Sequence, residues 1–578
     1  MKKAKTLLAI LLTLAVVLAI AACGGNGTTT SQQPGGSSPA GGDSSPAGGD
    51  SSPAGGGASS PAGGGSSPAG GGSNPAGGGG EKPWVSFTIG NSAWLGRFLA
   101  GLNPSESMTA CDGVFDSITR INPATREYES DVLTSFGFED DTTYVMTLRD
   151  DVYFSNGDHA TAEDLYFSYW NHPERGSNWL QNHGIIWEES GPRDEYTVAF
   201  KLERPYPAFA DRMMYLIDKK WSEEVGWDSM DWYDPVGSGP YYVYEYVNDS
   251  HITLRTRESR GDTVWNDANK NMWVDEWIVK YYPDPTTLYM ALQTGEVDYA
   301  DIDPIDYGRY VQDGASAPDY KLINVQAGSV SYFMFGFEDS DLWFDKRLRE
   351  AVAHGVDWAR VGEVAMGPCY IDALSTASTI CEDYIALGRY EYNVDMAKDL
   401  MEQAGYGPNK RLTLQTTMMN GDFYRNMFEA VQYYFADFYI DLSVDFADNA
   451  GAIAIWLAPG GTDCGCWYAF SGSPTGNYAV AINEIRPNTG LTWSGVQDQF
   501  VLDQYDILTS SPDAAVRSAA TKAIQQRLFD EVLYIPVAEW TLCYGWRTAV
   551  FTDQQVAANR GAGNYIQVGR WGRASSWN

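Results

Sequence analysis

Alternating apolar and polar positions in the first half of the chain predict β-strands. The alternation is clear at Tyr144–Leu148 and at Tyr196–Leu202. Two further stretches, Tyr241–Tyr246 and Ile252–Arg257, flank the turn-forming run from Asn248 to Ser250, as the strands of a hairpin do. Period-two alternation is typical of strands that bury one face.

Helix-start and helix-stop signals lie between and after these strands. Asp, Asn, Ser and Thr before a periodic apolar run favour the N-cap, whereas Gly favours the C-terminal end. The signals predict helices from Thr161 through Tyr169, from Asp284-Pro285 to Gly295, from Asp345 and from Asp357 to about Gly367, from Asn393 to Gly405, and from Ser511-Pro512 through Phe529. This mixed order predicts an α/β or α+β protein, and a folded body of about 500 residues predicts two or three domains.

The N-terminus has the features of an export signal. Lys2, Lys3 and Lys5 precede an apolar run, Leu7–Ala22, which is shorter than the roughly 20 residues that a membrane-spanning helix needs. The run ends in Ile-Ala-Ala-Cys23, which resembles the bacterial lipobox. The resemblance implies that residues 1–22 are a lipoprotein signal peptide and that Cys23 is acylated and anchors the protein on the outer face of a membrane. The alternative is an ordinary cleaved signal peptide with an incidental Cys23.

Residues 23–80 repeat a unit close to Ser-Ser-Pro-Ala-Gly-Gly. Side chains larger than Ala are almost absent, so the segment has too little apolar surface to offset its ordering entropy. We predict a disordered tether of roughly 40 Å average span, with the folded body beginning near Glu81. No second apolar run of spanning length follows, so we expect the lipid to be the only membrane attachment.

Composition narrows the class of partner. Lys and Arg number 39 against 75 Asp and Glu, giving a net charge of −36. This balance argues against a nucleic-acid binder, which needs a basic surface. Apolar residues make up 44% and charged residues 20% of the chain, which is ordinary for a globular protein.

Six cysteines remain besides Cys23, in a chain that the signal predicts to be exported. One to three disulfides are possible, and the sequence leaves their connectivity open. A metal or redox site would need more Cys or His nearby, and the five histidines are scattered, so we interpret the cysteines as structural disulfides or buried thiols. They are Cys111, Cys369, Cys381, Cys464, Cys466 and Cys543.

Blocks of sequence along nearly the whole folded body resemble family 5 extracellular solute-binding proteins, the oligopeptide, dipeptide and nickel group that serves ABC importers. One such block is Leu292-Gln-Thr-Gly-Glu-Val-Asp298. The other blocks occur along the chain in the same order as in the family: Phe115–Pro123, Leu148–Gly157, Ala160–Ser168 and Pro235–Tyr241 before this block, and Phe344–Val352, Ala397–Tyr406 and Tyr534–Val537 after it.

The resemblance implies an α/β fold, a two-lobed clamp like that of periplasmic binding proteins (type II, similar to cluster C), with an extra domain inserted in lobe I. Two segments cross between the lobes, and we expect them near residues 325 and 530. Mapped by these landmarks, lobe I comprises residues 81–115, 235–325 and 530–578, the inserted domain residues 116–234, and lobe II residues 326–529.

The implied function is to capture a peptide, oligopeptide or dipeptide, in the interlobe cleft and deliver it to an ABC permease with its ATPase. Closure on a ligand shifts a population by hinge motion and needs no chemical step, so we expect a monomeric binding protein without enzymatic activity or cofactor. The chain has 20 Trp and 36 Tyr, whose rings can stack on sugars, so an oligosaccharide is an alternative ligand. A tethered secreted glycan hydrolase is the rival from another class, and a sensor that signals to a receptor is a third possibility.

In peptide-binding members of the family, an Asp in lobe II pairs with the amino terminus of the peptide. The corresponding aromatic-rich region here is Trp456–Tyr468, and Asp463 is the candidate, since a desolvated ammonium needs a carboxylate partner. The match is loose, because the family's usual Asp-Tyr-x-x-Pro run is absent. Trp456, Trp467 and Tyr468 are candidates for the aromatic wall of the pocket, against ordinary core packing.

One acidic stretch resembles the start of a calcium loop. Asp267, Asn269 and Asn271 alternate, and Asp275 follows closely. The pattern then departs from an EF-hand, which has Gly at position six and Glu at position twelve. A structural calcium and a plain surface hairpin are the two interpretations of this stretch.

Overall fold

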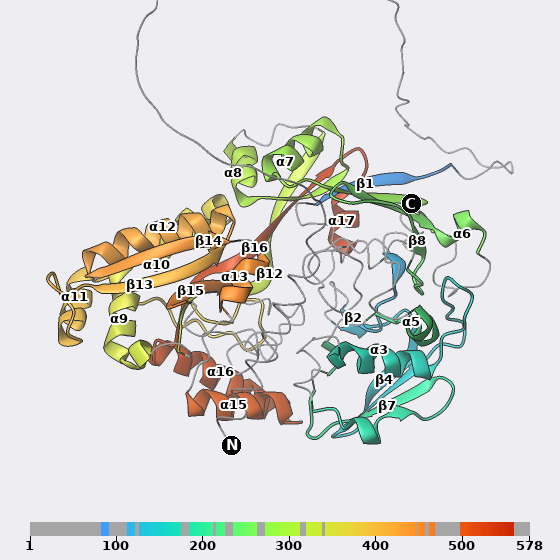
Figure 1. Ribbon diagram of the computed structural model, residues 1–578, viewed down its shortest axis with the longest axis horizontal. Coiled ribbons are helices and arrows are strands. Elements are labelled where there is room, and N and C mark those ends of the chain that lie inside the picture. Colours follow the sequence, from blue (N-terminus) through green and yellow to red (C-terminus); the bar gives the residue numbers. More distant parts are fainter. Residues whose placement is uncertain are drawn as a thin grey trace, which may run out of the picture. The chain divides into compact units, whose positions relative to one another are not determined.

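Figure 1 shows a computed structural model of the chain, and the described residues all lie within the unit Glu81–Asn578. Within the described part, no helix has both the length and the apolar character that crossing a membrane requires. The structure describes residues 83–91, 113–121, 127–174, 184–207, 209–211, 215–225, 235–262, 272–312, 319–337, 341–447, 449–456, 462–468 and 498–559.

An eight-stranded mixed sheet organises the unit. Its central strand β1 runs parallel to both of its neighbours, whereas the pairings towards either edge are antiparallel. In spatial order the strands are β15 (Cys464–Tyr468), β12 (Tyr320–Phe335), β16 (Tyr534–Arg547), β11 (Tyr299–Ile302), β1 (Ser86–Asn91), β10 (Glu276–Tyr281), β9 (His251–Thr256) and β8 (Tyr241–Val247).

Strands β12 and β16 are much longer than the others and pair antiparallel along nearly their whole length (Figure 1). The N-terminal half of β12 pairs with the C-terminal half of β16, which also pairs with β11 on its other side. The C-terminal half of β12 pairs with the N-terminal half of β16 on one side and with β15 on the other. The register shifts between the pairs Gln326–Thr541 and Ser329–Trp540, and Gly328 there has φ +78°. A bulge at this point bends and twists the strand, and glycine adopts the left-handed conformation without a steric penalty.

Helices and a second, two-stranded parallel sheet surround the β15 end of the large sheet. Phe333 of β12, Phe428 and Leu528 are fully buried in the largest apolar cluster of the described residues. The elements here are η5 (Asp341–Phe344), α9 (Lys346–Gly355), α10 (Trp358–Met366), η6 (Gly367–Cys369), α11 (Val394–Gln403), β13 (Leu412–Met419), α12 (Asp422–Asp437), β14 (Ile440–Ala447), α13 (Asn449–Trp456), α15 (Gln499–Ser510) and α16 (Ala514–Asp530).

The other end of the sheet has a separate core. Trp277, Leu254 and Ile252 are fully buried there with side chains of β8 and β16. Helices α6 (Arg257–Arg260) and α17 (Asp553–Asn559) lie at this end of the sheet. Helices α7 (Pro285–Thr294) and α8 (Pro304–Gln312) instead bury Leu292 and Tyr310 in the first cluster.

A third apolar cluster, with Ile118, Phe154 and Leu216 fully buried, gathers residues between positions 118 and 216. The buried Arg257 donates to the carbonyl oxygens of Tyr153 (3.1 Å) and Phe154 (2.9 Å), and so fixes this part to the end of β9. The elements are β2 (Arg120–Ile121), β3 (Tyr128–Glu129), β4 (Leu133–Asp140), β5 (Thr143–Leu148), α3 (Ala162–Glu174), η1 (Trp187–Glu189), β6 (Gly191–Pro192), β7 (Thr197–Lys201), η2 (Phe209–Asp211) and α5 (Lys219–Val225).

Most predicted helix starts are confirmed by their caps. The side chains of Asp284, Asp345, Asp357 and Asn393 each accept a backbone N–H in the first turn. The last predicted helix begins later than expected, because Asp513 caps α16 by accepting from Ala515 and Val516, and Pro512 precedes the helix. Helix α3 runs five residues beyond the predicted end at Tyr169. Strand β9 ends at Thr256, and Arg257 already begins α6.

Candidate functional site

Asp463 lies immediately before β15 and links three elements. Its amide N–H donates to the carbonyl of Gln415 in β13 (2.9 Å), and its Oδ2 accepts the Gln415 N–H (2.8 Å). Its carbonyl accepts the amide of Gly336 (3.0 Å) and the indole N–H of Trp343 (2.5 Å). The backbone of Asp463 is therefore anchored on both sides, while its carboxylate stands at an exposed edge beside Gln415.

Trp456 lies at the end of α13 with 3% of its surface exposed, and its indole N–H donates to the carbonyl of Thr417 (2.6 Å). The adjacent Thr416 carries a hydroxyl that accepts from Thr462 (3.0 Å) and donates to the Cys464 carbonyl. This bonded threonine cluster satisfies the buried polar groups where β13 meets β15. Trp456 therefore lies near Asp463. Its ring is packed as in a protein core, so little of it is accessible to a ligand.

Trp467 and Tyr468 belong to β15 by backbone position. They pair with Tyr332 and Ser331 of β12. Their side chains, like that of Cys466, lie outside the described residues, so their predicted roles in a pocket wall stay predictions. At the other end of the strand, burial and the nearby charge of Asp463 raise the pKa of the Cys464 thiol well above its ordinary value.

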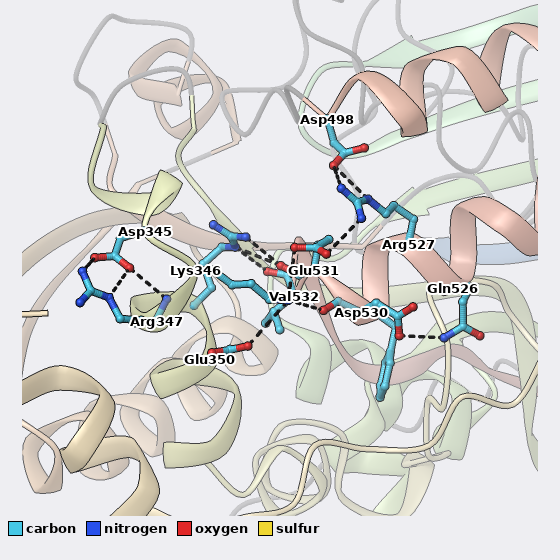
Figure 2. A network of polar contacts seen from close by, with 12 residues as sticks. Asp345, Lys346, Arg347, Glu350, Asp498, Gln526, Arg527, Asp530, Glu531 and Val532 are labelled. Carbon is cyan, nitrogen blue, oxygen red and sulfur yellow. Dashed lines mark hydrogen bonds and ion pairs between the residues drawn. The ribbon is translucent and has the colours of Figure 1, made fainter. Parts of the chain in front are cut away.

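A polar network holds the end of α16, and the turn that leads from it to β16, against α9 (Figure 2). Lys346 contacts the carboxylate of Glu531 (3.2 Å) and the carbonyl of Asp530 (2.9 Å), and Arg527 bridges Glu531 (3.0 Å) and Asp498 (2.9 Å). Figure 2 shows Val532 next to this network.

Val532 is buried and has φ +51°, which is costly for a β-branched residue. The guanidinium of Arg349 donates to the carbonyls of Val532 (3.1 Å) and Glu531 (2.9 Å). These bonds offset the strain and fix the angle at which the chain leaves α16 for the long strand.

An extended segment after η6 runs beside β16 near the bulge. Glu539 is fully buried, and its carboxylate accepts the hydroxyl of Ser378 (2.5 Å) and the amide of Thr379 (2.7 Å). The Thr379 hydroxyl in turn accepts the side-chain amide of Gln326 (2.8 Å), directly before the bulge in β12. Burial raises the pKa of Glu539 above its ordinary value.

A surface pocket of about 550 Å³ lies elsewhere, between α3 and α5. Acidic side chains line most of it, but Lys219 pairs with Glu163 (2.8 Å) and Lys220 with Asp158 (2.9 Å). None of the four predicted ligand residues lines it. Six carboxylates and two lysines line the pocket, so its charge balance is acidic.

No group of three or more His, Cys, Asp or Glu side chains in the described part is arranged to hold a metal ion. Of the calcium candidates, Asp267, Asn269 and Asn271 lie outside the described residues, as does Cys23. Asp275 is described, and its Oδ2 accepts the amide of Val85 (2.8 Å) at the start of β1. The calcium site therefore stays a prediction.

Sequence reasoning missed the partners that hold these residues. Gln415, Trp343 and Ser378 carry no local signal, because each acts on a residue at least 48 positions away in the chain. Their roles follow from strand pairing, which a single sequence does not specify.

Comparison with known proteins adds the family. Residues 127–480 match the family model described as bacterial extracellular solute-binding proteins, family 5 middle. A protein of Brucella ovis named as an ABC transporter peptide-binding protein is 24% identical over 368 residues, which cover 60% of this chain. The matched part spans 65% of the length of that relative.

Solved structures share the fold at low sequence identity. AgaA of A. tumefaciens R10, in complex with agropinic acid, has a TM-score of 0.70 at 18% identity, with 84% of this chain and 97% of AgaA covered. DppA of Helicobacter pylori, in complex with the peptide STSA, has a TM-score of 0.69 at 18% identity and the same coverage. The two-lobed clamp of periplasmic binding proteins predicted from the sequence is thereby confirmed. The chain belongs to family 5 of the bacterial extracellular solute-binding proteins.

Proposed function

We propose that this protein captures peptides between its two lobes and delivers them to an ABC permease. The observation that carries the proposal is the antiparallel pairing of β12 with β16, whose bulge lies in the middle of the two strands that run through both halves of the large sheet. We take these strands as the segments that cross between the lobes. Such a bend concentrates a hinge in a few residues, and ligand contacts on both sides of it favour the closed form. Relatives named as peptide-binding proteins support a peptide as the ligand.

Asp463 is the proposed partner of the peptide's amino terminus. Its backbone is fixed by β13, Gly336 and Trp343, so the carboxylate is held in place before a ligand arrives. Pre-organisation of this kind lowers the entropic cost of binding. Trp467 and Tyr468 follow on the same strand and are proposed to line the pocket beside it, with Trp456 behind.

A small non-peptide ligand is the second candidate. AgaA shares the fold as closely as DppA does and was solved with agropinic acid. Fold likeness at this identity therefore does not select the ligand class. An oligosaccharide remains the third option, from the abundance of aromatic residues.

We further propose that Cys23 carries a lipid and that residues 23–80 tether the folded unit outside the membrane. The extracellular character of the family supports export. A permease and its ATPase are the proposed partners, and the protein is proposed to act as a monomer without chemistry on its ligand.

Calorimetric titration and thermal denaturation with a defined set of peptides test the proposal. At a peptide concentration 100-fold above Kd, mass action predicts stabilisation of about 2.7 kcal/mol. Chromatography of the recovered peptide should show it intact. Stabilisation by oligosaccharides but by no peptide would show that the ligand is a sugar. Hydrolysis of either compound would contradict the proposal that the protein only binds its ligand.

A further inference from the structure

Two buried cysteines far apart in the chain lie against each other where η6 meets β16. The Sγ atoms of Cys369 and Cys543 are 3.0 Å apart, although 174 positions separate the residues. This distance is shorter than the sum of the van der Waals radii of two sulfur atoms. Cys369 is 0% and Cys543 4% exposed, so no solvent separates the pair.

The backbone on both sides of the pair is fixed. Cys543 lies in β16 between Ile302 of β11 and Asn324 of β12. The carbonyl of Cys369 accepts the hydroxyl of Thr541 from the same strand (3.1 Å). The two sulfur atoms need to approach by only about 1 Å to reach the disulfide length of about 2.05 Å, and a small change in side-chain torsion can supply that.

We propose that Cys369 and Cys543 form a disulfide in the exported protein. Family 5 proteins act outside the cytoplasm, where disulfides form and persist. The oxidant is the disulfide of an extracytoplasmic thiol–disulfide oxidoreductase. One cysteine, as thiolate, attacks that disulfide to give a mixed disulfide and one oxidant thiol. The second cysteine then attacks the mixed disulfide, which forms the Cys369–Cys543 bond and releases the oxidant as a dithiol. Two cysteine thiols lose two protons and two electrons, and the oxidant gains them.

The order of folding and oxidation matters for this bond. Hydrogen bonding with Cys369, together with burial, raises the pKa of Cys543 far above its ordinary value. The thiolate that attacks a disulfide is therefore scarce once the core has closed. Oxidation belongs to the folding stage, while η6 and β16 are still accessible.

The bond fastens η6 to the crossing strand close to the hinge. Thr541, two residues before Cys543, pairs with Gln326 at the edge of the β12 bulge. The side of η6 away from β16 packs on α8, where Pro368 lies next to Gly308. The disulfide thus joins the helical part around α10 to the β11 side of the sheet, and it limits how far the segment between Cys369 and Thr379 can separate from β16 when the lobes move.

Disulfide mapping on the unmodified protein tests the proposal. The full chain is exported from a bacterial host, denatured in iodoacetamide without reductant, and digested with chymotrypsin, which cuts after Tyr370 and so separates Cys369 from Cys381. We expect one linked peptide pair that contains Cys369 and Cys543, lighter than the two free peptides by two hydrogen atoms and lost after reduction. The variant Cys381→Ser is the matched control on the same segment and should keep the link.

Alkylation of both Cys369 and Cys543 in the unreduced exported protein would overturn the proposal, as would a bond from either residue to another cysteine. A second readout uses stability. Wild-type protein that is reduced while denatured and then refolded in reductant should melt several degrees below the oxidised protein, whereas the same treatment should leave the Tm of the double variant Cys369→Ser/Cys543→Ser unchanged. An equal response of the two proteins to reductant would also contradict the bond.

Discussion

The guanidinium of Arg204 lies 3.0 Å from the carboxylate of Asp506, although 302 positions separate the two residues. Arg204 follows β7 in the part of the chain predicted as the inserted domain, and Asp506 lies in α15, in the part predicted as lobe II. We propose that this ion pair bridges the inserted domain and lobe II of the clamp and therefore responds to closure.

Reversal of one charge should weaken ligand binding, and reversal of both should restore it. The pair is partly exposed, so its contribution is small, at about 0–1 kcal/mol. We expect Arg204→Glu to weaken the affinity for a bound peptide up to about fivefold, because like charges then oppose closure. Calorimetric titration measures the change. The double variant Arg204→Glu/Asp506→Arg should bind nearly as well as the wild type, and equal affinities of the single and double variants would show that the pair plays no part in closure.

Asp463→Asn tests the proposed ammonium partner. The variant keeps the shape, and its amide oxygen can still accept the Gln415 N–H, so the fold should be preserved. A bound peptide would cover this carboxylate, so loss of the charge predicts weaker peptide binding by roughly 2 kcal/mol or more. Asp437→Asn, at an exposed position in α12, is the control with the same charge change. If Asp463→Asn changes peptide affinity by less than about twofold, a threshold well below that loss, the assigned role is wrong.

Glu539 predicts a specific dependence of stability on pH. Burial raises its pKa in the folded protein above the unfolded value near 4.5. A raised pKa means that the contribution of this group to stability is fully present below the unfolded pKa and is lost as the pH rises through the folded pKa. The wild type should therefore lose stability, relative to Glu539→Gln, as the pH rises from 4.5.

The Gln variant resembles the protonated acid, with its oxygen towards the Thr379 amide and its nitrogen towards the Ser378 hydroxyl. Thermal denaturation of both proteins between acid and neutral pH measures the effect. Parallel stability curves would show that Glu539 does not titrate in that range.

Cys23→Ser tests the lipid anchor. Two acyl chains bind a protein stably to a membrane, whereas the described part of the chain has no helix suited to cross one. In cell fractionation and in detergent phase partitioning, we expect Cys23→Ser to be lost from the membrane fraction and from the detergent phase. The control variant Cys111→Ser should remain in both. Unchanged membrane association of Cys23→Ser would contradict the anchor.

Local signals predicted much of the helical structure and the hairpin of β8 and β9, but not the rest of the large sheet. Asp284, Asp345 and Asp357 cap helices through bonds to residues two or three positions away, so a short window of sequence contains the whole interaction. The start of α16 was misplaced by two residues because Ser511-Pro512 and Asp513 carry competing start signals, and the carboxylate of Asp513 makes the bonds.

Strands β12 and β16 carried no comparable signal. Both are buried along much of their length, so the alternation that marks a half-exposed strand is absent. Their pairing joins residues about 200 positions apart, as in the contact of Ser331 with the Ala538 carbonyl. The same limit explains why Asp463 could be selected by family resemblance while its anchors, Gln415 and Trp343, could not.

Native mass spectrometry identifies the ligand that the protein binds in the cell. The mature protein would be extracted gently from cells grown in rich medium, and the species released from it would be fragmented. We expect peptides of mixed sequence to co-purify with the protein. Release of an oligosaccharide or another small molecule would contradict the peptide assignment, and an empty protein that degrades added peptides or glycans would contradict the binding-protein function itself.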